Sequence, residues 1–567
     1  GNARIPASSN RLIVVADLAE GDELDFGDRR NITIVRPYPK GRLDVREALL
    51  LSHVPSSTFR SELEDMGLPR DEAEDMAVKI GHSVPVLRRQ LSNDPEVRRP
   101  IWARDRPSAW LLLPFALAGS WAEGGNIDDQ AVIQLLGELE DGDIARVRDD
   151  LLALEDAPIA RYGNVNIVVS QLDALFAVGQ YVERADLDRF FELVPELLGD
   201  RDPALDLPQD QWWMANVLGH ERSYSGALLS GIGDTLCILS IYGNGLCGDR
   251  LGINVAHRAE QVVRALMYDA NEERWLTIRG QLRTLAEASP TAFLDCLEHE
   301  LRRPVPAISA IMGTVEGGIS GECLRTELLW ALELLAWQPA FFARVAEVVF
   351  DLRALEVQDN WSNSPQSTAR SLFLAWLPAT ALGAADRMRV LRDLSARFRG
   401  PAIDVCISLL PRGGPGFASR TARPQWRELA EQVLEPNDAE VLEVAIEASN
   451  LMLDLVPCDR NELERFIEVA TRLPPDDLER LVNEVERWAD DAADGDKAEL
   501  RHKLRKREAM RAYEEEEGAE QLVAALRRME EALEPQDPTA RHRWLFENGY
   551  VEWRALDREE AEGRLTW

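Results

Sequence analysis

The strongest constraint on the fold is a loose repeat in which a proline separates two apolar helical stretches. It occurs around Pro290, Pro339 and Pro401, and small or apolar residues follow each proline closely. The intervals between the three prolines are unequal. A two-helix unit of this kind leaves an apolar face that only a neighbouring unit can cover. The repeat therefore predicts helical hairpins that stack on one another.

Single stretches of the chain show the helical period as well. Apolar residues recur at steps of three and four from Leu187 to Leu198, before Gly199, and again from Leu478 to Trp488. The stretch from Leu328 to Trp337 is apolar nearly all round, which is typical of a helix in the middle of a stack. We expect a mainly α fold, an irregular HEAT-like α-solenoid.

Strands are expected only near the start of the chain, where Leu12–Val15 and Ile32–Val35 are short β-type runs. Three segments have the composition of linkers. Glu356–Thr368 is rich in Asn, Gln and Ser, Pro411–Pro424 holds three glycines, and Asp490–Asp496 precedes a long charged helix. The second is the clearest break, because its glycines and prolines do not continue a helix.

The charge balance limits the possible partners. The chain of 567 residues has 64 basic and 99 acidic side chains, and its formal charge of -35 repels phosphate backbones. A basic run at Arg501–Arg511 is followed at once by Glu514–Glu517, with which it can pair along a solvated helix. We therefore expect a protein partner and no nucleic acid, while the oligomeric state stays open.

The sequence also predicts a cytoplasmic protein. It has no uninterrupted apolar run of the roughly 18 to 20 residues that span a bilayer, and no secretory signal at its start. Since the chain begins at Gly1 without an initiator Met, we expect a fragment or a trimmed protein. The six cysteines are scattered without a CxxC, so they suggest small buried apolar residues and neither a disulfide framework nor a zinc site.

One motif is typical of dinucleotide binding. Gly243-Asn244-Gly245-Leu246-Cys247-Gly248 spells GxGxxG between an apolar stretch and a predicted helix. In a Rossmann unit such glycines allow the backbone to approach a pyrophosphate. The preceding stretch is equally typical of a buried helix, and Gly243 could end it. An interhelical loop is the favoured interpretation, with a dinucleotide site as the alternative.

Other candidates for chemistry lack supporting residues. Asp17 follows an apolar strand as a Walker B acid would, but the chain has no GxxxxGK[ST] phosphate loop. Cys296 and His299 are three residues apart on a predicted helix and could be metal ligands or a thiol and its base, yet no second pair accompanies them. The sequence therefore predicts no catalytic residues, no metal and no cofactor.

Residues 11–105 resemble the end of a nucleotide-switch ATPase of the STAND class, which includes NACHT and NB-ARC proteins. The two strand-like runs match its sensor region, and Leu63–Lys79 matches part of its helical lid. The resemblance implies that Gly81 and Pro85 would lie against a base and Arg88 would point toward phosphates. The phosphate loop and Walker B acids are missing, so residues 1–105 would be a small N-terminal α/β remnant of such an ATPase, or an excerpt.

From Trp110 onward the chain is similar to the long helical region that follows the ATPase in large bacterial proteins of this class. The resemblance implies a role in antiviral defence. It divides the chain into a helical domain at 106–270, HEAT-like repeats at 271–410 and a C-terminal helical domain at 425–567. The matching landmarks are helix-packing segments, among them Trp212-Trp213, Tyr224-Ser225, Trp330-Ala331, Trp376-Leu377-Pro378 and Pro424-Gln425-Trp426-Arg427.

Three functional hypotheses remain open. The leading one is a non-catalytic sensor or scaffold on which a protein partner is recognised. The second is a helical regulator cut by a CHAT-type protease within 411–424, and the third is a dinucleotide-binding enzyme that uses Gly243–Gly248. The loop at 411–424 is also predicted to be sensitive to proteolysis because it combines glycines with basic residues. Its residues of interest are Arg412, Gly413, Gly414, Arg420 and Arg423.

Overall fold

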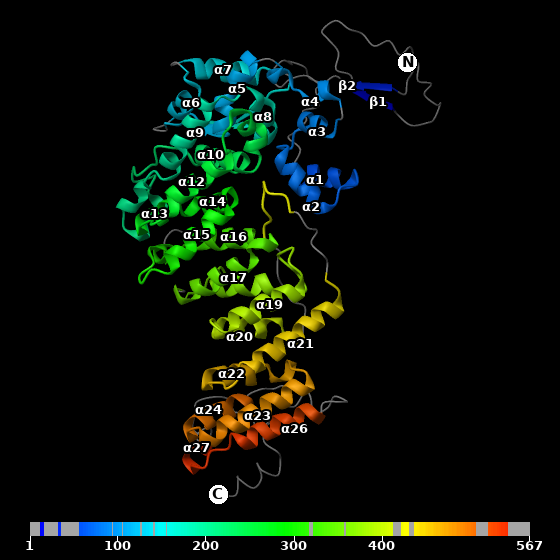
Figure 1. The fold of residues 1–567 in the computed structure, drawn as a ribbon, viewed down its shortest axis with the longest axis vertical. Coiled ribbons are helices and arrows are strands. Elements are labelled where there is room, and N and C mark those ends of the chain that lie inside the picture. The colour runs from blue at the N-terminus through cyan, green and yellow to red at the C-terminus, as the bar shows by residue number, and fades with distance from the viewer. Residues whose placement is uncertain are drawn as a thin grey trace. The chain divides into compact units, whose positions relative to one another are not determined.

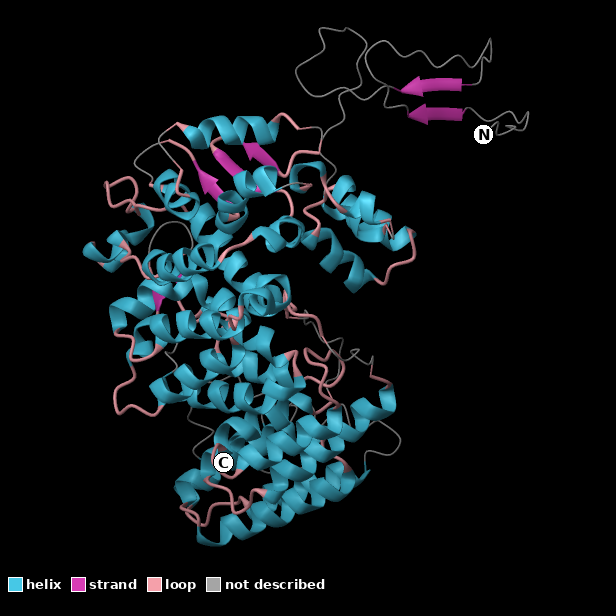
Figure 2. Ribbon diagram, turned by 45° about the horizontal axis from the view of Figure 1, so that its top comes forward, coloured by secondary structure: helices cyan, strands magenta, loops and turns pink. Residues whose placement is uncertain are grey.

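The computed structural model describes residues 12–15, 32–35, 56–92, 94–104, 106–124, 128–139, 142–154, 156–316, 321–355, 359–411, 421–429, 436–505 and 520–542. These residues are mainly α-helical, as the sequence predicts, and their sheets are small (Figure 2). The chain divides into two units, Gly1–Gly67 and Leu68–Trp567.

The first unit contains the two strands that the sequence predicts. β1 (Leu12–Val15) and β2 (Ile32–Val35) pair in parallel, with Leu12 opposite Ile32 and Val15 opposite Val35. One helix, α1 (Ser56–Asp65), also belongs to this unit. Asp17 lies outside the described residues.

The second unit begins with short helices around a three-stranded antiparallel sheet of order β3-β5-β4, seen as magenta arrows in Figure 2. α7 packs against β4, and α10 packs against β3. The sequence did not predict this sheet, whose strands are three or four residues long. The elements are α2 (Arg70–Lys79), α3 (Val84–Leu91), α4 (Pro95–Arg98), η1 (Ile101–Ala103), α5 (Arg106–Ala118), β3 (Ser120–Ala122), α6 (Asp129–Gly137), α7 (Asp143–Leu152), β4 (Ile159–Tyr162), β5 (Val165–Val168), α8 (Gln171–Val178) and η2 (Gly179–Tyr181).

Two rows of helices follow (Figure 1). In one row α10, α14, α16 and α18 pack in succession, and in the other α9, α12, α15 and α17 do so. The rows pack on each other through the pairs α10–α12, α14–α15 and α16–α17. The bounds are α9 (Arg184–Leu198), η3 (Pro203–Asp206), η4 (Gln209–Met214), α10 (Gly226–Gly243), η5 (Asn244–Gly248), α11 (Asp249–Leu251), α12 (Val255–Met267), α13 (Glu272–Ile278), η6 (Arg279–Gln281), α14 (Leu282–Ala288), α15 (Pro290–Leu301), η7 (Ala307–Ile311), β6 (Thr314–Val315), β7 (Glu322–Cys323), α16 (Thr326–Ala336), α17 (Pro339–Leu352), η8 (Arg353–Leu355) and α18 (Pro365–Phe373).

Packed helices continue to the last described residues. α20 contacts α18, α19 and α21; α21 contacts α23, and α23 contacts α26. The bounds are α19 (Ala384–Ser395), α20 (Arg399–Leu409), α21 (Asp438–Asp454), α22 (Arg460–Val469), η9 (Ala470–Arg472), α23 (Pro475–Asp491), α24 (Asp494–Arg505), α26 (Glu520–Ala532) and α27 (Pro538–His542).

The helix boundaries follow from local sequence. Pro290 and Pro339 are the first residues of α15 and α17, where a missing N–H costs no helical hydrogen bond, and Pro401 lies in the first turn of α20. α9 starts with a reciprocal capping box between Glu183 and Asp186 and ends at Gly199. The predicted proline junctions are thus confirmed as helix starts.

α10 is the central helix, in contact with α5, α8, α9, α12, α14 and β3. Its glycines allow this close packing: a Cβ on Gly231 would lie 2.3 Å from the Ala118 carbonyl oxygen, and one on Gly233 2.7 Å from Thr284. Among the described residues, the stretch Gly226–Leu251 is long and apolar enough to cross a membrane, and 67% of its most apolar window is buried inside the protein. Such burial is what the packing of a core helix requires.

Arginines tie successive helices together across both rows. In one row Arg283 of α14 pairs with Glu327 of α16 at 2.6 Å. In the C-terminal helices Arg399 of α20 pairs with Glu462 of α22 at 2.6 Å, and Arg528 of α26 with Glu486 of α23 at 3.0 Å. Only five of the 64 basic residues are lysines. The planar guanidinium can bond carboxylates from two helices at once, which suits this role.

Candidate functional site: a tryptophan-lined pocket

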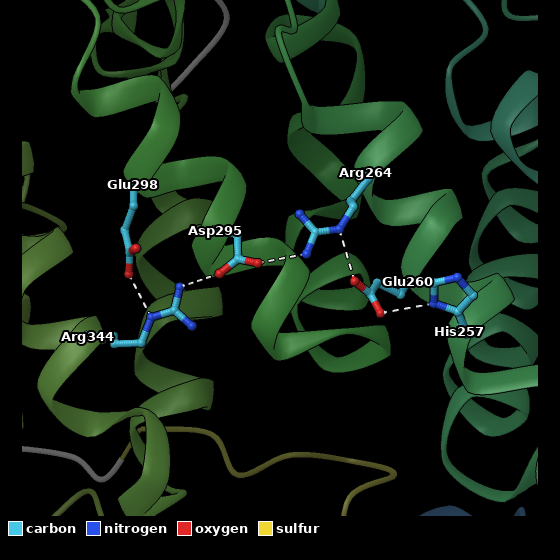
Figure 3. Close-up of polar contacts among 6 residues, drawn as sticks. All are labelled: His257, Glu260, Arg264, Asp295, Glu298 and Arg344. Atoms are coloured by element: carbon cyan, nitrogen blue, oxygen red, sulfur yellow. Dashed lines mark hydrogen bonds and ion pairs between the residues drawn. The ribbon is translucent and has the colours of Figure 1, made fainter. Parts of the chain in front are cut away.

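A polar network, drawn in Figure 3, links α12, α15 and α17. Arg264 and Arg344 both donate to Asp295 at 2.7 Å, Arg344 also donates to Glu298 at 2.7 Å, and Arg264 donates to Glu260 at 3.0 Å. Burial acts to raise the pKa of Asp295, but the two guanidinium groups outweigh it and hold that pKa below its usual range. The Asp295 carboxylate is therefore a fixed ionised partner. The network ties helices together and is unsuited to proton transfer.

A pocket of about 220 Å³ lies instead where the chain leaves α9 and turns through η3 and η4 before α10. The turn-rich segment supplies most of its wall, and η6 and β7 supply the rest. The lining residues are Asp202, Ala204, Trp212, Trp213, Ala215, Asn216, His220, Arg222, Arg279 and Glu322.

Asp202 is the anchor of this pocket. Its carboxylate accepts hydrogen bonds from Arg222 at 2.8 Å and from the backbone N–H of Ala204 at 3.1 Å, and it pairs with Arg279 at 3.7 Å. Burial acts to raise the pKa of Asp202, yet hydrogen bonding and charge from Arg222 prevail and lower it. The carboxylate is therefore ionised at neutral pH and holds both arginines in place.

Tryptophans form the other wall. Trp212 donates its indole N–H to the Leu207 carbonyl oxygen at 3.1 Å, and the Arg279 guanidinium lies 5.8 Å from its ring centroid. Trp213 is 61% exposed, and Val217 and Leu218 beside it are 85% and 46% exposed. An open apolar cluster thus adjoins an ordered pair of arginines.

A similar pairing occurs nearby along the chain. Arg283, four residues after Arg279, lies 5.2 Å from the ring centroid of Trp330, which is 41% exposed. Glu327 holds Arg283 in place at 2.6 Å. We call Trp212, Trp213, Arg279, Arg283 and Trp330 the tryptophan–arginine surface.

The chemistry available at the pocket is recognition. Its ten lining residues include no serine, threonine, cysteine or lysine that could act as a nucleophile. His220 uses Nδ1 in a contact of 3.1 Å with the Pro203 carbonyl oxygen, and the Asp202 carboxylate is already occupied by arginines. The site therefore offers aromatic faces, guanidinium groups, one carboxamide and the exposed Glu322 carboxylate to a ligand.

The GxGxxG motif lies within helical turns. Gly243 ends α10, Asn244–Gly248 form a π-helical turn, and α11 follows directly. A Cβ on Gly243 would lie 2.6 Å from Val255, and one on Gly248 would lie 2.6 Å from the Ile253 carbonyl oxygen. The strand–turn–helix geometry of a dinucleotide site is absent at these described residues, and so is the interhelical loop that we favoured. Gly243 and Gly248 serve close packing, whereas a Cβ on Gly245 would meet nothing within 4 Å.

The residues suggested by the ATPase resemblance are separated. Pro85 and Arg88 are exposed on α3, and Gly81 packs so tightly on Val169 that a Cβ would lie 1.6 Å from its carbonyl oxygen. The buried arginine of α3 is Arg89, the residue after Arg88. Arg89 bonds Asp173 at 2.7 Å and also contacts Asp156.

Cys296 and His299 are not a thiol–base pair. Cys296 is buried in the core, and burial raises the pKa of its thiol to about 11. His299 is at the surface, where it pairs with Asp269 at 2.9 Å and stacks on Tyr268. Within the described part of the chain, no three His, Cys, Asp or Glu side chains gather as metal ligands would.

Most of the proteolysis-prone loop, including Arg412, Gly413, Gly414 and Arg420, lies outside the described residues. Arg423 is described, and its guanidinium lies 4.9 Å from the ring centroid of Trp337. The pocket itself was not predicted as a site. The available signal was the pair Trp212-Trp213 in a turn-rich segment after Asp202-Pro203, which we had treated as a packing landmark.

No family model, curated protein or solved structure matches this chain.

Proposed function

We propose that this chain is a non-catalytic helical scaffold that binds a protein partner through the tryptophan–arginine surface. The observation that carries the proposal is the exposure of Trp213 in the same pocket as the ordered Arg279. Tryptophan and arginine are the residues most enriched at the energetic centres of protein interfaces. A partner that covers this surface gains both apolar burial and bonds to pre-placed guanidinium groups.

The energetics favour a protein over a small ligand. The pocket of about 220 Å³ is smaller than the ~300–1,000 Å³ typical of small-molecule sites. A tryptophan can bury roughly 150–250 Å². At ~25 cal/mol per Å² such a ring contributes about 4–6 kcal/mol of transfer free energy before ordering costs. Those gains require a surface broad enough to cover Trp213 and its neighbours together.

The arrangement of helices supports a scaffold. Two rows of packed helices, tied by arginine–carboxylate pairs, are consistent with an irregular α-solenoid, in which stacked units offer an extended binding surface. The resemblance of residues 11–105 to STAND-class proteins supports a place in bacterial antiviral defence. In that setting the scaffold would be a cytoplasmic sensor whose partner shifts an effector between two states.

The test compares Trp213→Ala with a matched control. Trp376, 41% exposed and outside the proposed surface, provides the control variant Trp376→Ala. Tagged wild-type and variant proteins are used to capture partners from cells, and captured proteins are quantified and cross-linked. We expect at least a tenfold loss of one partner with Trp213→Ala alone and cross-links near residues 209–222. Equal capture by all three proteins, or cross-links confined to other segments, would contradict the proposal.

A further inference from the structure

Residues 421–429, which we call the strap, are non-helical and contact helices distant in sequence. Their partners are Asp234 and Tyr242 of α10, Glu287 and Ala288 at the end of α14, and Trp337 just after α16. We call these five residues the strap-binding face. The contacts join residues as many as 192 positions apart.

Glu287 holds the backbone of the strap. Its buried carboxylate accepts three successive backbone N–H groups, from Gln425 at 3.2 Å, Trp426 at 2.5 Å and Arg427 at 2.9 Å. Three consecutive N–H groups around one anion form a compact recognition unit. A segment must bend at this point to present them, and residues 425–427 do form a bend.

Two side chains of the strap, Trp426 and Arg427, each form their own hydrogen bonds with the strap-binding face. Trp426 is 5% exposed, and its indole N–H donates to Asp234 at 3.2 Å, while Tyr242 donates to the Trp426 carbonyl oxygen at 3.1 Å. Arg427 donates to the carbonyl oxygens of Glu287 at 2.7 Å and Ala288 at 3.1 Å. These carbonyls lie at the C-terminal end of α14, where a cation is favoured.

The N-terminal half of the strap contacts Trp337. Trp337 donates its indole N–H to the Ala422 carbonyl oxygen at 3.0 Å, and Arg423 lies over the Trp337 ring. Pro424, the residue after Arg423, is buried. The strap makes all of these contacts through its backbone groups, the Trp426 ring and its arginine guanidinium groups. A separate peptide with the same residues could therefore make the same contacts.

We propose that the strap-binding face is a peptide-recognition site for a non-helical segment that bends at a Trp followed by Arg, and that the strap is its intramolecular ligand. The face is acidic, with Glu287 buried and Asp234 half-buried, and it matches the N–H donors and the guanidinium of such a segment. A partner carrying a Trp-Arg segment competes with the strap for the face. The site is separate from the tryptophan–arginine surface and does not depend on it.

A tethered segment outcompetes a free one because its effective concentration near the face is in the millimolar range. The wild-type protein therefore binds added peptide poorly until its own strap is weakened. This predicts a specific pattern. Strap variants gain affinity for a peptide that copies the strap, and face variants lose that gain.

The probe is a fluorescein-labelled peptide of residues 421–429, Thr-Ala-Arg-Pro-Gln-Trp-Arg-Glu-Leu, measured by fluorescence anisotropy against the full chain. We expect Trp426→Ala/Arg427→Ala protein to bind it at least tenfold more tightly than wild type. Adding Glu287→Ala to that variant weakens peptide binding at least tenfold, which removes the gain. A peptide with alanine at the Trp and Arg positions does not bind, and Gln425→Ala protein, which keeps its backbone N–H, behaves as wild type.

Circular dichroism and size-exclusion chromatography establish that each variant is folded. Should the double variant fail to fold, Arg427→Ala alone gives the same test with a smaller gain, and hydrogen exchange of wild type supplies a second readout. Excess peptide then raises deuterium uptake in 421–429 and leaves the deuterium uptake of the helices unchanged. No binding to a folded strap variant, equal binding to wild type, or a gain that survives Glu287→Ala would overturn the proposal.

Discussion

The pocket at Asp202 and the strap-binding face place the same residue types together, but one is open and the other is covered. Trp213 at the pocket is 61% exposed, whereas Trp426 of the strap is 5% exposed. The carboxylates differ as well. Arg222 lowers the pKa of Asp202 against the effect of burial, while burial and the neighbouring Glu287 raise the pKa of Asp234 to about 6.

The difference shows how the strap changes the surroundings of the residues that it covers. Where the strap covers the face, Trp426 is buried and the pKa of Asp234 is raised. Where no described segment covers the pocket, Trp213 stays exposed, and the arginines hold the buried Asp202 ionised. Substitutions should therefore affect stability at the strap-binding face and recognition at the pocket.

The largest expected contrast is between the two tryptophans. Trp426→Ala removes a buried ring and leaves Asp234 without its donor, so we expect a loss of about 3–5 kcal/mol. Trp213→Ala removes a ring that is mostly in water and should change stability by less than about 0.5 kcal/mol. Thermal melting of the two variants measures this contrast. Equal melting temperatures would show that the strap contributes nothing to the folded state.

Glu287→Ala should have the next largest effect, because it leaves three backbone N–H groups without their charged acceptor. Hydrogen bonds to charged groups contribute about 1.5–3 kcal/mol each. We expect local opening of residues 425–427 to become easier by about 3 kcal/mol, which corresponds to about 100-fold faster amide exchange. Hydrogen exchange with mass spectrometry measures it, and Glu322→Ala at the pocket is the matched control. Unchanged exchange in 425–427 would contradict the observed hydrogen bonding.

The contrast also shows where sequence analysis succeeds. The helical stretches at 187–198, 328–337 and 478–488 and the strands at 12–15 and 32–35 were predicted, because their patterns are local. The proline repeat was correct for the same reason, since a proline fits the first turn of a helix. Periodicity alone was enough for these elements.

The strap could not be assigned from sequence, because its partners are distant. We treated Pro424-Gln425-Trp426-Arg427 as a helix-packing landmark at the end of a predicted linker, and nothing near it identifies Glu287, about 140 residues earlier, as its anchor. The three-stranded sheet was missed because strands as short as Ser120–Ala122 carry little pattern. At Gly243–Gly248 the motif was present, but Gly243 and Gly248 serve contacts with Val255 and Ile253 that only the fold reveals.

The two sites should respond differently to pH. The folded-state pKa of Asp234 is raised to about 6 from 3.8, so the folded protein binds the proton more tightly than the unfolded chain. Stability from this group therefore increases as pH falls below about 6, by about 1 kcal/mol at pH 5 relative to pH 7. Glu287 shifts in the same direction, and Asp202, with a lowered pKa, contributes no change across this range.

The measurement is the melting temperature from pH 5 to 7.5, taken as the difference between wild type and Asp234→Asn. We expect this difference to vary with pH, whereas the difference for Asp202→Asn stays flat. A flat profile for Asp234→Asn would show that the strap leaves Asp234 hydrated, and the contrast between the two carboxylates would disappear.

The smallest effect is expected from the pocket's outer ion pair. Glu322 is 52% exposed and accepts from Arg279 at 3.4 Å, so water and salt screen the interaction. Glu322→Gln should lower stability by less than about 0.5 kcal/mol, and the difference should vanish above ~0.5 M salt. Asp202 still holds Arg279, so partner binding through Trp213 should persist in this variant. A large, salt-independent loss of stability would mean that the pocket is closed like the strap-binding face, and its assignment as an open recognition site would fail.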